Sequence, residues 1–498
     1  MLGSDLTRRE VLNRGGRLLG AAAGAQAAAS WAGSSSSSAR GARRDWRQLE
    51  RSLRGSLLRP GDAGFRAASA AENYRYASVV PAGIALCAGA EDVRTCVRWA
   101  RENRVPLVAR SGGHSFAGYS RTSGLQVDLR RMRSATVDLD AGTLRVTGAV
   151  RFSDLDAVLK PQNLFIPAGQ CPPVGVNGFT LGGGFGFYSR MHGLAVDQLV
   201  RTQVVLASGD KVTADRSRHP DLFWACRGGG GGNFGINTSM TFSLFPVGRV
   251  SVCTCQWSTG LETVLNQFQE LFGRVPDTFS LIVRITPATQ AAGASGPTVI
   301  AFGHYFGPSQ ELRDILGPVL SAAPASQAQF LDLDFWKARE YLADLPGPPS
   351  SYVERSRFVD EPMSNAGVAT VLDWTSRWPG AGSTGGRMDY WLWGGAMNAP
   401  SPRSTAFVHR TARSLFAVGA NWPPSTPRRT VEPLISWVND TWAAVGPHAT
   451  DYAYQNFTDP ALKDWKRAYY GANLRRLTRV KRAYDPDELF KFRQSIPT

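Results

Sequence analysis

Two side chains that can act as nucleophiles, His114 and Cys171, stand in glycine-rich surroundings. The sequence around the first reads Arg-Ser-Gly-Gly-His-Ser over residues 110–115, and the sequence around the second reads Gly-Gln-Cys-Pro-Pro-Val-Gly over residues 169–175. An imidazole nitrogen and a thiolate can both attack an electrophilic carbon. These two residues are the first candidates for chemistry in the chain.

Three glycine clusters accompany them: Gly112-Gly113, Gly182–Gly184 with Gly186, and Gly228–Gly232. Glycine is used where backbone must approach a ligand closely or adopt a positive φ. Successive backbone N–H groups can also form a concave site for a phosphate. None of the clusters matches the dinucleotide fingerprint or the P-loop. The clusters therefore indicate a nucleotide held by some other fold.

The composition indicates a folded protein of more than one domain. A chain of 498 residues exceeds the size of a single core and should form two or three domains. Its 43% apolar and 19% charged residues are typical of globular proteins. The net charge of +16 comes mainly from scattered arginines. Because no basic helix alternates with aromatic residues, arginine-rich codon usage explains this charge better than nucleic-acid binding.

The six cysteines do not predict a metal site. No pair of CxxC motifs is present, which argues against zinc. Cys253 and Cys255 would share one face of a strand, and buried thiols are the default interpretation. Cys87 and Cys96 are spaced so that a disulfide across a strand and helix stays open as an alternative.

Residues 1–33 resemble a twin-arginine signal peptide. The segment Thr7–Leu12 reads Thr-Arg-Arg-Glu-Val-Leu and precedes a mildly apolar run that ends at Ala29. That run is too short and too weakly apolar for a stable transmembrane span. We therefore expect a secreted or periplasmic protein carried by the twin-arginine export machinery; a disordered basic tail is the alternative. Residues 34–75 are expected to form a linker and a short helical segment.

The remaining chain predicts an α+β architecture in three parts. Residues 76–247 alternate short strands with helices, residues 248–447 carry β-rich segments separated by helices, and residues 448–498 are aromatic and basic. The expected strands are Ala82–Cys87, Val105–Ala109, Leu125–Leu129, Ala135–Asp138, Thr143–Thr147, Leu199–Leu206, Phe279–Ile285, Thr298–Phe306 and Met388–Trp393. The expected helices include Ala90–Asn103 and a helix around Lys463–Tyr469.

Eight motifs in a fixed order carry a family resemblance. They are residues 110–115, residues 169–175, Leu181–Gly186, Ser189–Leu194, Asp221–Arg227, Asn233–Ile236, Tyr454–Phe457 and Tyr484–Pro486. Together they resemble the berberine bridge enzyme-like family of the vanillyl-alcohol oxidase (PCMH) flavoprotein superfamily, over residues 76–497. The resemblance implies a PCMH-type FAD-binding domain in two α+β subdomains, followed by a substrate domain with an antiparallel sheet flanked by helices. It also implies that residues 448–498 return to the FAD domain.

The same resemblance implies roles for individual residues. FAD would be bound covalently, with His114 joined to the 8α-methyl group and Cys171 joined to C6. Val174 aligns with the position that gates oxygen in the family. Further contacts to FAD are implied for Arg110, Ser111, Gly112, Gly113, Ser115, Gly175, Gly178, Gly235, Ile236, Tyr454 and Asn456. The plain alternatives are a turn histidine, a buried structural thiol and a core valine.

The sequence identifies the catalytic base less clearly than the residues that would bind FAD. The family motif is usually Tyr-x-Asn-Tyr, and residues 454–457 read Tyr-Gln-Asn-Phe, which leaves Tyr454 as the candidate. A phenol with a reference pKa of about 10 needs a positive neighbour or coupled hydride transfer to act as a base. Asp389 could polarise Tyr454, although a structural or surface role is the slightly favoured alternative. Phe185 stands where many relatives carry a second tyrosine.

The resemblance implies an exported oxidase that passes hydride from an alcohol-type substrate to flavin N5 and reduces O2 to H2O2. The donor would be a sugar or oligosaccharide hydroxyl, or a secondary-metabolite alcohol or phenol. One alternative is a dehydrogenase that uses an acceptor other than oxygen. Phe185 and Phe457 keep a second alternative open, a flavin-loaded binding protein with little turnover. No motif in the middle of the chain indicates the substrate, and no feature of the sequence indicates the oligomeric state.

Overall fold

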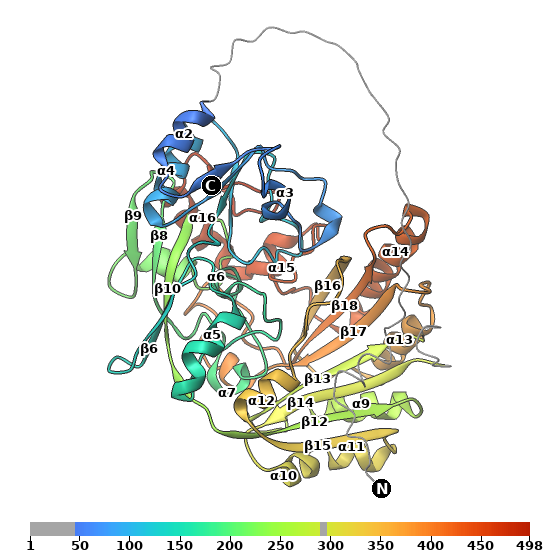
Figure 1. Ribbon diagram of the computed structural model, residues 1–498. Coiled ribbons are helices and arrows are strands. Elements are labelled where there is room, and N and C mark those ends of the chain that lie inside the picture. The colour runs from blue at the N-terminus through green and yellow to red at the C-terminus, as the bar shows by residue number, and fades with distance from the viewer. Residues whose placement is uncertain (1–44, 289–295) are drawn as a thin grey trace.

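The computed structural model describes residues 45–288 and 296–498, and it confirms the expected α+β fold (Figure 1). The twin-arginine segment and residues 34–44 lie outside the described residues. Three small sheets are formed by strands within residues 56–246, and one large sheet is formed by strands within residues 249–422. Within the described ranges, no helix is long and apolar enough to cross a membrane.

The first small sheet delivers the histidine loop. Its strands are ordered β1 (Ser56–Leu58), β2 (Gly83–Leu86), β4 (Leu125–Asp128) and β3 (Leu107–Arg110). Strands β2, β4 and β3 run parallel, and the helix between β2 and β3 is α4 (Ala90–Glu102). The apolar face of α4 packs Val93 and Val97 into the core of this sheet. Strand β3 ends at Arg110, so the loop that contains His114 begins at the end of a buried strand.

The second sheet is antiparallel and supports the cysteine loop. Its order is β5 (Ala135–Asp138), β6 (Thr143–Thr147), β10 (Ile236–Ser243), β8 (Leu199–Val205) and β9 (Lys211–Ala214). A two-stranded sheet pairs β7 (Leu164–Phe165) with β11 (Phe245–Pro246). The helices here are α5 (Phe152–Leu159), α6 (Val176–Leu181), α7 (Ser189–His192) and α8 (Pro220–Ala225). Cys171 lies between β7 and α6, in a segment whose backbone is hydrogen-bonded to the start of α5.

The large sheet is antiparallel and has seven strands. Its order is β15 (Gln327–Asp334), β12 (Arg249–Trp257), β14 (Thr298–Tyr305), β13 (Phe279–Thr286), β17 (Gly385–Leu392), β18 (Ser414–Trp422) and β16 (Ser351–Val359). The helices of this region are α9 (Leu261–Leu271), α10 (Ser309–Ile315), α11 (Gly317–Ala322), α12 (Phe335–Tyr341), α13 (Asn365–Ser376) and α14 (Arg428–Ala444). Helices α9, α13 and α14 pack on one face (Figure 1).

Side chains on this sheet alternate with period two. Val283 of β13, Met388 of β17 and Phe416 of β18 point into the core beneath the helices. Their neighbours in sequence therefore point to the opposite face, which looks toward the FAD-binding part of the chain. Several of those neighbours are charged, and they return below as part of the site.

The end of the chain leaves the large sheet and lies among the small sheets (Figure 1). Helix α15 (Trp465–Tyr470) covers most of the helix expected around Lys463–Tyr469, whereas α16 (Leu474–Tyr484) was not expected. Lys481 of α16 is fully buried and donates to the Asp485 carboxylate, to Asn233 O and to Phe490 O. This ammonium group ties the last residues to the glycine segment that precedes β10.

Most strand predictions agree closely with the structure. Strands β5 and β6 have the expected bounds, and β13 and β14 differ from theirs by one residue at the C-terminal end. All six cysteines are free thiols, so the disulfide allowed for Cys87 and Cys96 is not formed. The domain borders near residues 75, 247 and 447 stay predictions.

Candidate active site

One cavity of about 350 Å³ joins the small sheets to the large sheet. The sequence-predicted residues that line it are Ser111, Gly112, Gly113, His114, Ser115, Cys171, Val174, Gly175, Gly178, Gly235, Ile236, Asp389, Tyr454 and Asn456. They come from all three parts of the chain. The fold therefore brings together residues that motif order alone could not place in space.

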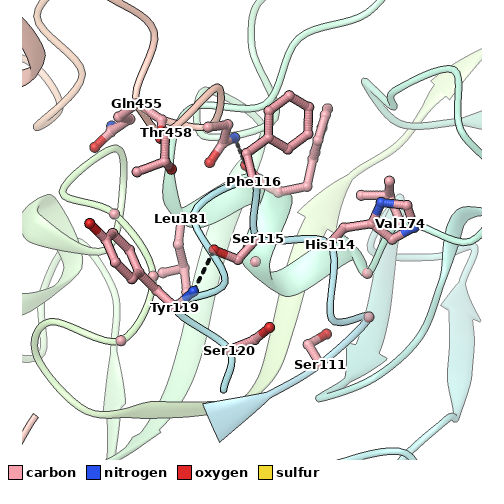
Figure 2. Close-up of a pocket in the computed structure, with 18 of the residues that line it drawn as sticks. Ser111, His114, Ser115, Phe116, Tyr119, Ser120, Val174, Leu181, Gln455 and Thr458 are labelled. Atoms are coloured by element: carbon pink, nitrogen blue, oxygen red, sulfur yellow. Dashed lines mark hydrogen bonds between the residues drawn. The ribbon is translucent and has the colours of Figure 1, made fainter. Parts of the chain in front are cut away.

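Two glycine-containing loops meet backbone to backbone at one wall. A Cβ on Gly112 would lie 2.4 Å from the Gly175 amide nitrogen, and a Cβ on Gly175 would lie 2.5 Å from the Gly112 nitrogen. Neither loop can carry a side chain at this point without moving the other. Gly113 has φ of 83°, and the Ser115 hydroxyl accepts a hydrogen bond from the Tyr119 amide at 2.9 Å (Figure 2). These constraints hold the loop of residues 111–120 in one tight shape around the cavity.

Arg110 is the exception among the predicted cofactor residues. Arg110 does not line the cavity in the described part of the chain. Its guanidinium donates to Ala70 O at 2.7 Å and packs 2.9 Å from the place where a Cβ on Gly113 would stand. The expected contact between Arg110 and the pyrophosphate is therefore not supported by its position. The side chain supports the loop from behind, because β3 ends with Arg110 pointing away from the cavity.

His114 is a neutral imidazole held near a carboxylate. Its Nε2 atom lies 3.5 Å from Glu72 Oε1 and makes no hydrogen bond within the described part of the chain. Burial lowers the pKa of His114, with the Glu72 carboxylate acting in the opposite direction. A lowered pKa leaves the ring uncharged at neutral pH, with one of its two nitrogens unprotonated and nucleophilic. His114 and Val174 both reach the cavity (Figure 2).

Cys171 has its own carboxylate partner. Its Sγ atom donates to Asp344 Oδ2 at 3.3 Å. Burial raises the pKa of the Cys171 thiol well above its ordinary value, and the negative charge of Asp344 adds to that effect. The free cysteine is therefore a protonated thiol at neutral pH.

Four alternating charges lie on the cavity face of the large sheet, and we call them the charged ladder: Arg284, Asp389, Arg387 and Glu354. Arg284 donates two hydrogen bonds to Asp389, at 2.7 and 3.0 Å. Arg387 Nε lies 3.5 Å from Asp389, and Arg387 Nη2 donates to Glu354 at 2.5 Å. All four line the cavity, and both carboxylates are buried.

The register of the sheet explains how the charged ladder forms. Arg284 of β13 stands directly opposite Asp389 of β17. Strand β18 lies between β17 and β16, and its Gly419 is opposite both Arg387 and Glu354. A Cβ on Gly419 would lie 3.3 Å from Glu354 Oε2. The missing side chain therefore leaves space for Arg387 to cross β18 and reach Glu354.

Glu354 differs chemically from Asp389. Burial raises the pKa of Glu354, although Arg387 partly offsets this. The Glu354 carboxylate in turn raises the pKa of Arg387. Both oxygens of Asp389 accept from Arg284, whereas the described hydrogen bonds of Glu354 reach only Oε2. Glu354 is the ladder carboxylate with an oxygen left for a further partner.

Tyr454 is deeply buried, and its phenol oxygen is already occupied. The oxygen accepts hydrogen bonds from Gly184 N at 3.0 Å and from Asn456 Nδ2 at 2.9 Å. Burial raises the pKa of Tyr454 despite these two donors. Because the hydrogen bonds of Asp389 go to Arg284, the expected pairing of Asp389 with Tyr454 is not formed among the described residues.

Aromatic rings complete the cavity beside Tyr454. Phe185 contacts Tyr454 and Trp391, with centroid separations of 5.0 Å in each case. Phe457 stacks on Phe116 at 5.3 Å. The two phenylalanines that replace expected tyrosines are thus parts of one apolar wall.

The residues present fit FAD. Along the cavity, five polar side-chain atoms are buried without a hydrogen-bond partner in the described structure: Ser111 Oγ, His114 Nε2, Asn177 Oδ1, Trp391 Nε1 and Gln455 Oε1. Buried polar atoms are normally satisfied, so such a row indicates a polar ligand along this wall. Gly112 and Gly175 both line the cavity, and without side chains their backbone leaves room for a dinucleotide to lie close to it.

The fold and this cavity define a flavin-dependent oxidoreductase, and comparison with known proteins gives its family. Residues 81–215 match the family described as FAD binding domain, and residues 453–497 match the family described as berberine and berberine like. The uncharacterized FAD-linked oxidoreductase YgaK of Bacillus subtilis is 33% identical over 426 residues, which cover 83% of this chain and 90% of that protein. The chain belongs to the berberine bridge enzyme-like family of FAD-linked oxidases.

Further relatives agree with this assignment. Glucooligosaccharide oxidase of Sarocladium strictum is 27% identical over 455 residues, covering 82% of this chain and 86% of that protein. The solved structure of BBE-like 1 from Physcomitrella patens superposes with a TM-score of 0.82 at 29% identity, covering 91% of this chain and 98% of the other. The predicted family, fold class and FAD cofactor are confirmed.

Five site residues were not predicted from the sequence: Glu72, Arg284, Asp344, Glu354 and Arg387. Arg387 and Asp389 stand two apart in an otherwise apolar strand, and this spacing places both on one face. That spacing was a readable signal. Glu72 and Asp344 reach the nucleophiles from distant loops, and no local pattern marks them.

Proposed function

We propose that this protein is an exported oxidase that removes hydride from an alcohol-type donor and passes the electrons to O2, with FAD joined to His114 and Cys171. One observation carries the proposal. The same cavity is lined by two nucleophiles that suit flavin attachment and by the charged ladder, whose two buried carboxylates suit a hydroxylated donor. FAD supplies the hydride acceptor when it is bound.

The two anchoring side chains reach the cavity from different loops. His114 is neutral at neutral pH because of its burial and can add through a ring nitrogen. Cys171 faces the same cavity from the segment before α6. Two bonds from separate loops would fix the cofactor rigidly, leaving the opposite wall free for a bulky donor.

We propose that Glu354 is the base that accepts the proton of the donor hydroxyl. A neutral phenol cannot accept a proton, and burial keeps Tyr454 neutral. Asp389 is committed to Arg284 through both oxygens. Glu354 is a buried carboxylate with a raised pKa and lines the cavity, which are the properties of a general base. Tyr454 and Asp389 then keep the flavin-side wall and the charged ladder in place.

Oxygen reactivity is proposed from Val174. It lines the cavity, and its backbone is fixed by bonds to Cys171 and Phe152. In the family resemblance this position gates oxygen, and a small valine leaves access open. Substitution to Ile should therefore slow the reoxidation of reduced enzyme without slowing its reduction.

The donor class is tested by an anaerobic screen of the purified yellow protein. Sugars and oligosaccharides form one arm, because a relative is named glucooligosaccharide oxidase. Alkaloid and phenolic alcohols form the other arm, because another relative is named tetrahydroberberine oxidase. We expect the flavin to bleach with one arm and to recover on mixing with oxygen, with release of H2O2. Bleaching without recovery favours a dehydrogenase, and no bleaching favours a binding protein.

Attachment and export have separate tests. After denaturation and precipitation, flavin should remain with the wild type and with each of His114→Ala and Cys171→Ala. Release of flavin from the wild type overturns covalent binding. Export is tested by Arg8→Lys with Arg9→Lys, which should abolish secretion while the cell extract still contains yellow protein.

A further inference from the structure

The loop that carries Cys171 is hydrogen-bonded to a segment far along the chain, residues 342–344. Helix α12 ends at Tyr341, and the residues that follow run beside the cysteine loop. Gln170 Nε2 donates to Leu342 O at 3.4 Å, and Asp344 N donates to Gln170 O at 3.2 Å. These two bonds hold Asp344 where its Oδ2 accepts from Cys171 Sγ at 3.3 Å.

The thiol at this place needs a proton acceptor before it can react. The thiolate is the reactive form of cysteine, and burial together with a neighbouring negative charge raises the pKa of Cys171. No cation donates a hydrogen bond to Cys171 among the described contacts. The thiol must therefore lose its proton during the reaction, to a group already within hydrogen-bond distance.

We propose that Asp344 is the general base that takes the proton of Cys171 while its sulfur forms the bond to C6 of FAD. This inference rests on the proposed double attachment and adds the residue that makes one half of it possible. Asp344 lies at the exposed rim of the cavity, so the accepted proton can pass to water.

The step balances with oxygen as the oxidant. The S–H bond breaks and its proton passes to Asp344, while the sulfur electron pair forms the S–C6 bond. The hydrogen of C6 leaves as a proton, and the two electrons that stay on the ring are taken by O2. One thiol, one flavin and one O2 thus give one thioether-linked flavin and one H2O2.

The test is a peptide map of Cys171 in protein purified with its flavin. Unfolded wild type, Asp344→Asn and Glu340→Gln are treated with an alkylating reagent, and the Cys171 peptide is scored as flavin-linked or alkylated. Glu340→Gln is the matched control, because it removes an exposed carboxylate from the same segment without a contact to Cys171. We expect linked peptide in the wild type and control, and at least a tenfold excess of alkylated peptide in Asp344→Asn, with its flavin still held by His114.

The outcomes separate the two claims. If wild-type Cys171 is fully alkylated, double attachment is wrong and this inference falls with it. If Asp344→Asn is linked as completely as the wild type, the inference is wrong and double attachment stands. A merely structural role is tested by Asp344→Ala, purified with its flavin held by His114 and incubated in air with sodium formate. Formate should restore linkage if a missing proton acceptor is the defect, and failure to restore it counts against the proposal.

Discussion

The two walls of the cavity are built on opposite principles. The flavin wall is made where backbone approaches backbone, and Gly112 and Gly175 leave no room for a side chain. The opposite wall, which we propose binds the donor and call the substrate wall, is made of charged side chains that pair across strands, as Arg387 does with Glu354. The flavin wall depends on glycines that carry no side chain. The substrate wall depends on ion pairs in which both partners must be present.

This difference indicates that the two walls have different functions: one holds the cofactor and the other contacts the donor. A wall of close-packed backbone holds a large cofactor in one position and tolerates little change. A wall of paired charges can exchange one hydrogen bond for another when a hydroxylated molecule arrives. Damage to the flavin wall should therefore appear as lost cofactor, whereas damage to the substrate wall should appear as slow chemistry or lost stability with cofactor retained.

The largest effect is expected from Glu354→Gln. Loss of a general base should slow flavin reduction by about 10²- to 10³-fold. Burial raises the pKa of Glu354 above its ordinary 4.5. The base works only when ionised, so the wild-type rate should rise with pH through this raised pKa and then level off. Stopped-flow reduction across the pH range measures both effects.

The control for this prediction is Asp389→Asn. It removes the other carboxylate of the charged ladder and should keep the rise with pH. If the rate of flavin reduction still rises with pH in Glu354→Gln but not in Tyr454→Phe, the proton acceptor lies in the flavin wall. The proposed difference in function between the two walls is then wrong.

A second prediction contrasts two glycines of the flavin wall. In Gly112→Ala the new methyl meets backbone of the Gly175 loop, which should cost about 1–3 kcal/mol of unfolding free energy and most of the bound flavin. In Gly178→Ala the new Cβ meets no protein atom within 4 Å, and alanine favours helix α6 by about 1 kcal/mol. Because Gly178 lines the cavity, this variant should fold normally and still bind less flavin.

Thermal unfolding and the ratio of flavin to protein absorbance separate these outcomes. Equal flavin content in Gly178→Ala and the wild type would show that the cofactor does not pass along α6. Equal stability of Gly112→Ala would show that the two loops can move apart, and the rigid description of this wall would then fail.

The same contrast explains what the sequence revealed. A backbone cradle needs glycines close together in the chain, so residues 110–115 and 169–175 were recognisable, and the strand that leads to the first was predicted within two residues. The short strand β7, which leads to the second, was not predicted. The charged ladder draws on β13, β17 and β16 and depends on register with Gly419 of β18, which no local pattern encodes. Asp389 was found without its partners. Helix α16 was missed although Leu474, Leu477, Val480 and Tyr484 recur at helical spacing, so its signal was present in the sequence.

A third prediction concerns the charged ladder itself. Asp389→Asn leaves the Arg284 charge without its bidentate partner, and it should lower the unfolding free energy by about 2 kcal/mol. Flavin content should stay at the wild-type level. The matched control is Glu432→Gln, which breaks an exposed pair with Arg428 on α14 and should cost less than about 0.5 kcal/mol. Denaturant unfolding compares the two, and equal losses would mean that the ladder contributes no more than a surface pair.

The smallest effect on rate is expected from Tyr454→Phe, and it tests the boundary between the walls. The substitution removes the acceptor of the Gly184 amide and of Asn456, leaving buried donors unsatisfied at a cost of about 1–2 kcal/mol. Since burial keeps Tyr454 neutral, flavin reduction should change by no more than about threefold. A fall of about 10²-fold with unchanged stability would instead make Tyr454 the base and return the proton transfer to the flavin wall. The stability loss and the unchanged rate must therefore appear together for Tyr454 to be a positioning residue that holds the Gly184 turn in place.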